Sequence, residues 1–188
     1  DSGEVNGVLY YVMPFVEGES LRDRLTRDGK VPFEEAVALN REIASALGYA
    51  HAQGIVHRDI KPENIMLSGG HAVVADFGIA RALRVAAGGQ QMTGLGFAIG
   101  TPAYMSPEQA GAAGADIDTR SDIYGLGVLL YELLTGTTPF DSKKLMGSGL
   151  DQMLRIIREE EPVRPSTRVS TLSDAGSEVG IVRDTDTW

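Results

Sequence analysis

The sequence predicts an α+β fold in which helices dominate and short strands make up the rest. Two long segments, 33–50 and 123–134, carry apolar residues at spacings of three and four, the period of a helix with a buried face. Two short apolar runs, 65–67 and 72–75, predict a strand hairpin. With 188 residues and 43% hydrophobic content, the chain can bury one substantial core, so we expect a single globular unit.

The first predicted element is a buried strand over residues 8–13, which is rich in β-branched and aromatic side chains. It stops at Pro14, because proline cannot donate to a central strand ladder. Ser20 is placed to cap a short helix, which we expect to end near Asp28 and Gly29.

Two longer helices are predicted further along the chain. The first covers about 32–53 and is ended by Gly54; its buried face is expected to consist of Phe33, Ala36, Leu39, Ile43, Leu47 and Ala50. The second is capped by Asp118 or Thr119 and ended by Gly136. Its apolar surface is broad enough to predict burial in the domain centre and contains Ile123, Leu126, Leu129, Leu130, Leu133 and Leu134.

Three further segments complete the expected organisation. Residues 88–96 are glycine-rich and polar without a sustained period, which predicts a loop. Residues 150–160 predict one more amphipathic helix. The polar run that follows has no convincing period, so we expect a domain over 1–165 and an irregular or disordered tail over 166–188.

The most informative motifs are HRDIKPEN at residues 57–64 and DFG at residues 76–78. Taken alone, the second is a common turn tripeptide, and the start of the first fits a solvated surface loop. In this order, on either side of the short apolar hairpin, the two motifs together indicate phosphoryl transfer.

Each chemical requirement of phosphoryl transfer has a matching residue in these motifs. Asp59 is placed to accept the proton of the attacking hydroxyl. Lys61, on the same side of an extended loop, can neutralise charge that develops on the γ-phosphoryl oxygens. Asn64 and Asp76 offer hard oxygen ligands, which suit Mg²⁺ and also Mn²⁺. We therefore predict ATP and Mg²⁺ as cofactors, with Mn²⁺ as a substitute.

The chain resembles the eukaryotic-like Ser/Thr protein kinases of bacteria over about 10–165. The likeness continues beyond the two motifs through GTPAYMSPE at 100–108 and DTRSDIYGLG at 118–127. The resemblance implies a protein-kinase-like fold, mainly its α-helical large lobe, with the hinge and one or two remaining strands of the small lobe. It also implies an enzyme that phosphorylates serine or threonine in proteins, because Lys61 stands in the motif typical of that branch.

The resemblance further implies a nucleotide pocket. Met13 is expected as the gatekeeper behind adenine and Met66 as the pocket floor; the alternative is that both methionines fill gaps in the core. The expected hinge and the remaining ATP-binding residues are Pro14, Phe15, Val16, Lys61, Asn64 and Asp76.

Other residues receive structural roles from the same resemblance: His57, Phe77, Gly78, Glu108 and Asp122. Asp122 is expected to anchor the backbone around His57 and Arg58. Glu108 stands in the Ser-Pro-Glu that replaces the family's Ala-Pro-Glu. The family pairs this glutamate with an arginine from a later helical motif that this chain does not show, so we expect Glu108 to lack a partner.

Three residues are assigned to the activation and substrate loop. Arg58 precedes the catalytic Asp59 and is expected to attract an anionic group, for which a phosphate on Thr93 is the leading candidate. Thr101 is expected to contact Asp59 and Lys61 instead. An ordinary solvated role remains the alternative for Thr93.

Composition excludes several other classes of function. The formal charge of −9 argues against a nucleic-acid-binding surface and against adsorption to anionic lipid. The absence of cysteine excludes disulfides and fits a reducing cytoplasm, and three scattered histidines are too few for zinc. No segment of this chain is predicted to span a membrane, although an anchor elsewhere in a parent protein is compatible with this sequence. Oligomeric state is not predicted.

The glycine-rich loop, strand lysine and helix glutamate that precede the hinge in the family have no counterpart here. We therefore expect a kinase domain cut at its small lobe, active within a parent protein on protein substrates and on itself, and inactive alone. The alternative is a pseudokinase or scaffold module, which the intact Asp59, Lys61, Asn64 and Asp76 disfavour. A metabolic small-molecule kinase is disfavoured by the peptide-docking character of residues 100–104.

Overall fold

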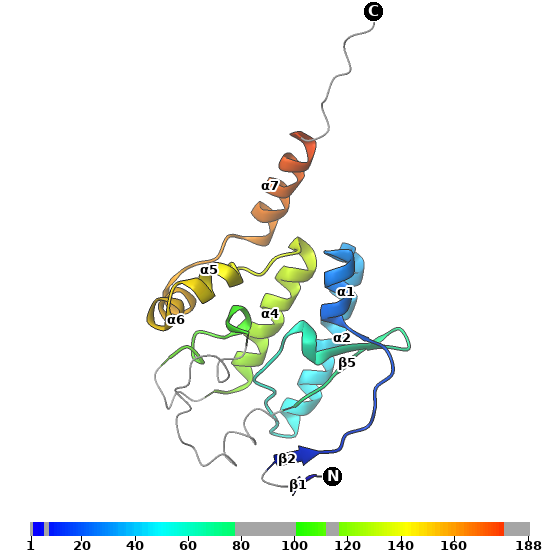
Figure 1. Cartoon of the computed structure of the whole chain (residues 1–188). Coiled ribbons are helices and arrows are strands. Elements are labelled where there is room, and N and C mark those ends of the chain that lie inside the picture. The colour runs from blue at the N-terminus through cyan, green and yellow to red at the C-terminus, as the bar shows by residue number, and fades with distance from the viewer. Residues whose placement is uncertain (1, 6–7, 78–100, 112–116, 179–188) are drawn as a thin grey trace, which may run out of the picture.

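The structure is a computed structural model of the chain, and it describes residues 2–5, 8–77, 101–111 and 117–178. In Figure 1, α2 and α4 run side by side through the centre of a mainly helical body. The helices are α1 (Leu21–Asp28), α2 (Phe33–Ala52), α4 (Thr119–Thr135), α5 (Ser142–Gly147), α6 (Leu150–Glu159) and α7 (Pro165–Glu178). The strands are β1 (Ser2–Val5), β2 (Val8–Tyr11), β3 (Glu19–Ser20), β4 (Ile65–Ser68) and β5 (His71–Val74). Within these described ranges, none of the helices is both long and apolar enough for a membrane crossing.

The strands form two antiparallel sheets, one of β1 and β2 and the other in the order β3, β4, β5. The predicted apolar hairpin is confirmed as β4 and β5. Gly69 and Gly70 join these strands with φ values of 57° and 85°, the positive values that a tight two-residue hairpin turn requires.

The prediction of a buried strand over 8–13 is partly wrong. The strand β2 ends at Tyr11, and the exposed fractions are 48% for Tyr10, 61% for Val12 and 46% for Met13. In Figure 1 the β1–β2 hairpin lies at the lower edge of the body, beyond the helices that form the core. Apolar composition predicted the strand, but burial depends on a covering layer.

The short helix α1 follows the local signals in the sequence. The Ser20 hydroxyl accepts a hydrogen bond from the Asp23 amide at 3.1 Å, and the Asp23 carboxylate accepts one from the Ser20 amide at 3.2 Å. This reciprocal pair is a capping box, which satisfies free amides at the helix start. The helix ends at Asp28, before Gly29 with φ of 77°. Both predicted ends are therefore confirmed.

The core consists of two clusters on opposite sides of α4. The first joins α1, α2 and α4 through Leu21, Leu25, Val31, Ala36, Leu39, Ile43, Leu47, Ile60, Ile65, Leu129 and Leu133. The second joins α4 to α5 and α6 through Ala103, Tyr104, Ala110, Val128, Leu145, Met153 and Ile157. The predicted central position of α4 is thus confirmed. Phe33 and Ile123 are corrections, because they are 64% and 62% exposed. Periodicity identifies a helix face, but it does not show how far neighbouring elements cover that face.

The prediction of an irregular tail from residue 166 is wrong for residues 166–178, which belong to α7. Pro165 begins this helix, and proline at a first helical position has a preset φ and loses no intrahelical hydrogen bond. The hydroxyls of Ser170 and Thr171 donate to the carbonyls four residues earlier, at 3.0 and 2.6 Å. Because the helix is largely polar, it has no apolar period that the sequence could reveal. Residues 179–188 lie outside the described residues.

Candidate active site

The candidate active site lies on the loop between α2 and β4. After α2 ends at Ala52, the Gln53 amide donates to the Ala50 carbonyl at 3.0 Å, and Gly54 turns the chain with φ of 73°. The end of this long helix therefore leads the chain directly into the loop of residues 57–64.

Asp122 on α4 holds the start of this loop. Its buried carboxylate accepts hydrogen bonds from the amides of His57 at 2.8 Å and Arg58 at 2.6 Å, and it lies 2.7 Å from His51 Nε2. The contact that the family resemblance implies is therefore present. It holds Arg58 at φ of 72°, a left-handed value. Such values cost non-glycine residues about 1–3 kcal/mol and persist only where surrounding contacts impose them.

His57 connects the loop to the segment that follows β5. Its Nε2 donates to the carbonyl of Ala75 at 2.8 Å, so Nδ1 is the acceptor of the 3.2 Å hydrogen bond from the Asp59 amide. The imidazole ring also packs against Phe77, with 4.7 Å between ring centroids. The side chain is 1% exposed. His57 is thus a structural link between the two sequence motifs.

Asp59, Lys61 and Asn64 come together as one polar group. Lys61 Nζ lies 2.7 Å from Asp59 Oδ2, and Asn64 Nδ2 donates to the same oxygen at 3.1 Å and to the Asp59 carbonyl at 2.7 Å. The Asp59 side chain is 33% exposed and Lys61 is 17% exposed. The carboxylate is therefore fixed by two donors and still reachable by a bound molecule.

Asp76 lies beside this group through the backbone. The Ala75 amide donates to the Asn64 carbonyl at 2.8 Å, which brings the next residue close to Asn64. Asp76 has φ of 62°, a second left-handed value in the site, and an exposed side chain. Gly78, the last residue of the motif, lies outside the described residues.

The oxygen atoms here fit a hard divalent cation. Because Asn64 uses its amide nitrogen on Asp59, its Oδ1 remains available as a ligand, and none of the described donors bonds to it. Asp76 adds an exposed carboxylate nearby. No group of three or more histidine and acidic side chains suited to a metal occurs in the part of the chain that the structure describes. Asn64 and Asp76 thus offer two side-chain oxygens of the kind that Mg²⁺ prefers, and their role as metal ligands stays a prediction.

The residues expected around adenine differ in how far they are buried. Met13 and Phe15 are 46% and 92% exposed, so Met13 fills no gap in the described core. Met66 is half-buried in β4, opposite Ser20 of β3. Their roles in binding ATP, with those of Pro14 and Val16, stay predictions.

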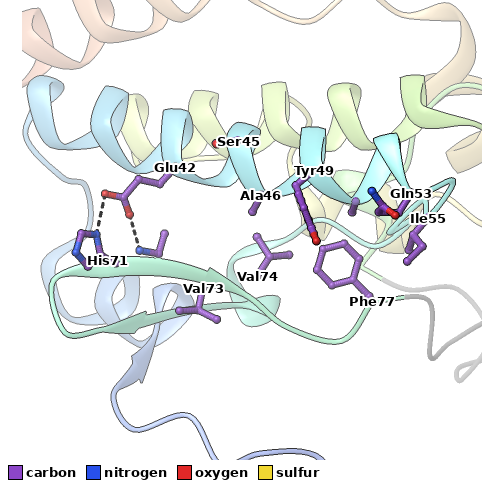
Figure 2. Close-up of a pocket in the computed structure, with 12 residues that line it drawn as sticks. Glu42, Ser45, Ala46, Tyr49, Gln53, Ile55, His71, Val73, Val74 and Phe77 are labelled. Atoms are coloured by element: carbon purple, nitrogen blue, oxygen red, sulfur yellow. Dashed lines mark hydrogen bonds and ion pairs between the residues drawn. The ribbon is translucent and has the colours of Figure 1, made fainter.

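A groove of about 740 Å³ occurs elsewhere, between α2 and β5. Figure 2 shows Tyr49 of α2 facing Phe77 there, and none of the expected adenine-binding residues lines the groove. At its far end Glu42 ties α2 to β5, because its carboxylate accepts a 2.7 Å hydrogen bond from the Ala72 amide. Phe77 thus lines the groove and also packs against the ring of His57.

The activation and substrate loop is described only from residue 101. Thr93 lies outside the described residues. Thr101 precedes the 3₁₀ turn η2 (Pro102–Tyr104), and its side chain makes no hydrogen bond to Asp59 or Lys61 among the described residues, contrary to expectation. The Arg58 guanidinium makes one long contact, 3.4 Å to the Ile117 carbonyl, and its buried Nε has no partner in the described ranges.

The expectation that Glu108 lacks a partner is wrong. Its carboxylate accepts a 2.6 Å hydrogen bond from the Ser121 hydroxyl of α4. Burial raises the pKa of the Glu108 carboxyl, but hydrogen bonds from Ser121 and Ser106 outweigh it and hold the pKa below its ordinary value. A hydroxyl of α4 thus contacts Glu108, the glutamate that the family pairs with an arginine.

One cluster at the site has no counterpart in the sequence analysis. Arg22 of α1 bonds to Glu63, Tyr104 and Glu132, which lie 41, 82 and 110 positions away. Burial lowers the pKa of Arg22, but its hydrogen bonds to the two glutamates raise it above the ordinary value. For the Tyr104 hydroxyl, burial acts in the opposite direction and raises the pKa. Because the partners are so distant in sequence, no local pattern indicates this cluster.

Comparison with known proteins identifies the family. The sequence profile described as protein kinase domain matches residues 2–179, from β1 to the end of α7. The chain belongs to the protein kinase domain family. The resemblance inferred from the motifs is confirmed.

Several curated relatives of this kinase-family chain are bacterial. It is 44% identical over 173 residues to serine/threonine-protein kinase PknB of Mycolicibacterium smegmatis, covering 89% of this chain and 26% of that protein. It is 43% identical over 178 residues to PknB of Mycobacterium leprae, covering 92% and 27%. With serine/threonine-protein kinase pkn2 of Myxococcus xanthus it shares 47% over 145 residues, covering 75% and 17%. The chain spans about a quarter of the length of the PknB relatives.

A solved structure supports the same fold. The crystal structure of a point mutant of the Mycobacterium tuberculosis PknI kinase domain aligns with a TM-score of 0.63 and 28% identity. The alignment covers 92% of this chain and 56% of that one. The predicted protein-kinase-like fold is therefore confirmed.

Proposed function

We propose that the protein carrying this chain is a serine/threonine protein kinase, which transfers the γ-phosphoryl group of ATP to hydroxyl groups of proteins in the cytoplasm. The observation that carries this proposal is the group formed by Asp59, Lys61 and Asn64, with 2.7 Å between the carboxylate and the ammonium. The names of the curated relatives, serine/threonine-protein kinases, support it.

Asp59 would act on the acceptor hydroxyl. Its Oδ2 is engaged by Lys61 and Asn64, which leaves Oδ1 without a described partner. That oxygen would orient the hydroxyl and take its proton as the bond to phosphorus forms. Lys61, which lies beside the same carboxylate, would offset negative charge on the transferred phosphoryl oxygens. Asp59 and Lys61 can act in this way if their loop is held in place. The hydrogen bonds of the loop backbone to Asp122 and to His57 hold it.

Asn64 and Asp76 would hold Mg²⁺, or Mn²⁺ in its place, against the phosphates. The metal would supply positive charge to the β- and γ-phosphate oxygens. The backbone hydrogen bond between Ala75 and Asn64 fixes the spacing of the two ligands. Adenine would contact Met13, the hinge residues and Met66, as the family resemblance implies.

We infer that a phosphate on Thr93 regulates this site through Arg58. The Arg58 guanidinium has no acidic partner among the described residues, and its Nε is buried without an acceptor. A phosphate carries close to two negative charges at neutral pH and would pair with it. Autophosphorylation by a second copy is the simplest source. Phosphate mapping by mass spectrometry, together with the activity of Thr93→Ala, tests this inference. Full activity of Thr93→Ala would contradict the regulatory role of Thr93.

The decisive experiment for the proposed function is Asp59→Asn in the full-length protein that carries this chain. Phosphate transfer to a generic acceptor protein is measured under single-turnover conditions with magnesium ATP. We expect a loss of about 100-fold or more, because the variant keeps the size of the side chain and removes its basicity. Asp151→Asn, an exposed carboxylate on α6, is the matched control. Transfer by Asp59→Asn at the rate of this control would overturn the assignment.

A further inference from the structure

Arg22 sits where the loop that carries Asp59 meets the turn that follows Thr101. Its Nε donates to Glu63 Oε1 at 2.9 Å, Nη1 to Glu132 Oε1 at 2.8 Å, and Nη2 to the Tyr104 hydroxyl at 2.8 Å. The Tyr104 hydroxyl in turn donates to Glu132 Oε2. The three nitrogen atoms of one guanidinium therefore form hydrogen bonds with side chains from three different segments of the chain.

The three partners belong to parts of the site with different tasks. Glu63 lies in the 3₁₀ turn η1 (Pro62–Asn64), directly before the proposed metal ligand Asn64. Tyr104 ends η2, in the loop on the acceptor side. Glu132 belongs to α4, whose earlier residue Asp122 anchors the catalytic loop. Arg22 thus fixes η1 and η2 to each other and to the central helix.

The charges make this link hard to replace. Two carboxylates share one guanidinium, and the Glu132 side chain is 9% exposed. Without Arg22, Glu132 would keep only the Tyr104 hydroxyl as a donor among the described residues. A buried carboxylate with one neutral donor moves or takes up a proton, and either change weakens its hydrogen bond with Tyr104. Lysine would restore the charge but not the fork that reaches three partners.

We propose that Arg22 is a positioning residue that sets the acceptor-side turn η2 against the catalytic loop. This rests on the proposed function. Arg22 touches no reacting atom, so it acts through Glu63 and Tyr104. Its loss should therefore impair use of the protein acceptor much more than it impairs ATP binding.

The test compares Arg22→Met with Arg24→Met in the full-length protein. Arg24 is a matched control, because it lies in the same helix, is 26% exposed against 30% for Arg22, and is paired with Asp28 at 2.6 Å and Glu35 at 3.0 Å. For Arg22→Met we expect kcat/KM for the acceptor protein to fall about 10- to 100-fold, the scale that misplacement by about 1 Å produces. The KM for ATP should stay within about twofold. Arg22→Lys should recover only part of the loss.

A second readout does not depend on activity. Hydrogen exchange is followed at the amides of Asn64, Tyr104 and Met105, which are bonded within their turns at 3.0, 3.1 and 3.1 Å. Arg22→Met should speed exchange at these three amides by about tenfold and leave amides in α2 unchanged, because the turns open locally. Arg24→Met should change none of them.

The results separate this inference from the proposed function. If the wild-type protein transfers no phosphate, the proposed function fails, and hydrogen exchange alone decides the role of Arg22. Equal exchange in Arg22→Met and wild type would overturn the inference. Full recovery of acceptor kcat/KM in the double variant Arg22→Met with Glu132→Gln would also overturn the inference. That variant removes the unpaired charge of Glu132 but does not restore the hydrogen bonds from Arg22 to the two turns.

Discussion

Asp122→Asn is the sharpest test of how this fold supports its site. The Asp122 carboxylate is 1% exposed and accepts hydrogen bonds from the His57 and Arg58 amides at 2.8 and 2.6 Å. Asparagine has the same shape but presents one oxygen and one amino group to two backbone donors. One amide therefore keeps a weaker neutral acceptor, and the other faces a donor and is left unsatisfied.

The expected loss follows from these two contacts. A hydrogen bond to a charged acceptor contributes about 1.5–3 kcal/mol, and exchanging a charged for a neutral acceptor costs about 1 kcal/mol more. We expect the free energy of unfolding to fall by about 2.5–4 kcal/mol, a large part of the roughly 5–15 kcal/mol typical of domains. Urea denaturation followed by far-UV circular dichroism measures this change.

Asp118→Asn provides the control, because it makes the same chemical change at the start of the same helix. Asp118 is the N-cap of α4, its side chain is 45% exposed, and asparagine caps helices as well as aspartate does. Its surface ion pair with Arg120 contributes at most about 1 kcal/mol. If Asp122→Asn loses no more stability than Asp118→Asn, the buried carboxylate does not hold the catalytic loop and the reasoning fails.

Three further predictions address the metal, the packing and the pH dependence. Asp76→Asn should weaken magnesium-dependent ATP binding in the full-length protein, and a magnesium titration identical to wild type would contradict its role as a ligand. Gly125→Ala should cost about 1–3 kcal/mol of stability, because a Cβ there lies 3.1 Å from the Ile60 Cβ. Gly127→Ala, which has nothing within 4 Å, should instead stabilise by about 0.5–1 kcal/mol in the same denaturation assay. The pKa of Glu42 is held below its ordinary value, chiefly by the hydrogen bond from the β5 backbone. Its contribution to stability is therefore present above the unfolded pKa of about 4.3 and lost as the pH falls through the folded value. The thermal unfolding temperature of Glu42→Gln should change less than that of wild type between about pH 5 and about pH 3, a window set around the ordinary pKa. Parallel pH profiles of the two proteins would refute the contribution of Glu42 to stability.

The sequence by itself determined the elements and groups that depend on neighbours along the chain. Asp59, Lys61 and Asn64 lie within six positions, so one turn of loop brings them together. Ser20 and Gly136 mark helix ends because capping and left-handed closure involve residues of the same helix. Such signals are local, and a single sequence contains them in full.

The tertiary structure alone decided which surfaces are covered and which distant charges meet. Phe33 and Ile123 have the right period for burial and are exposed, because no residue of their own helix determines what packs on it. Glu108 finds its partner in Ser121, and Arg22 meets Glu132 across 110 positions. These contacts arise when α1 and α4 pack against the same core. Their energies depend on burial and distance, and both quantities exist only once the chain has folded.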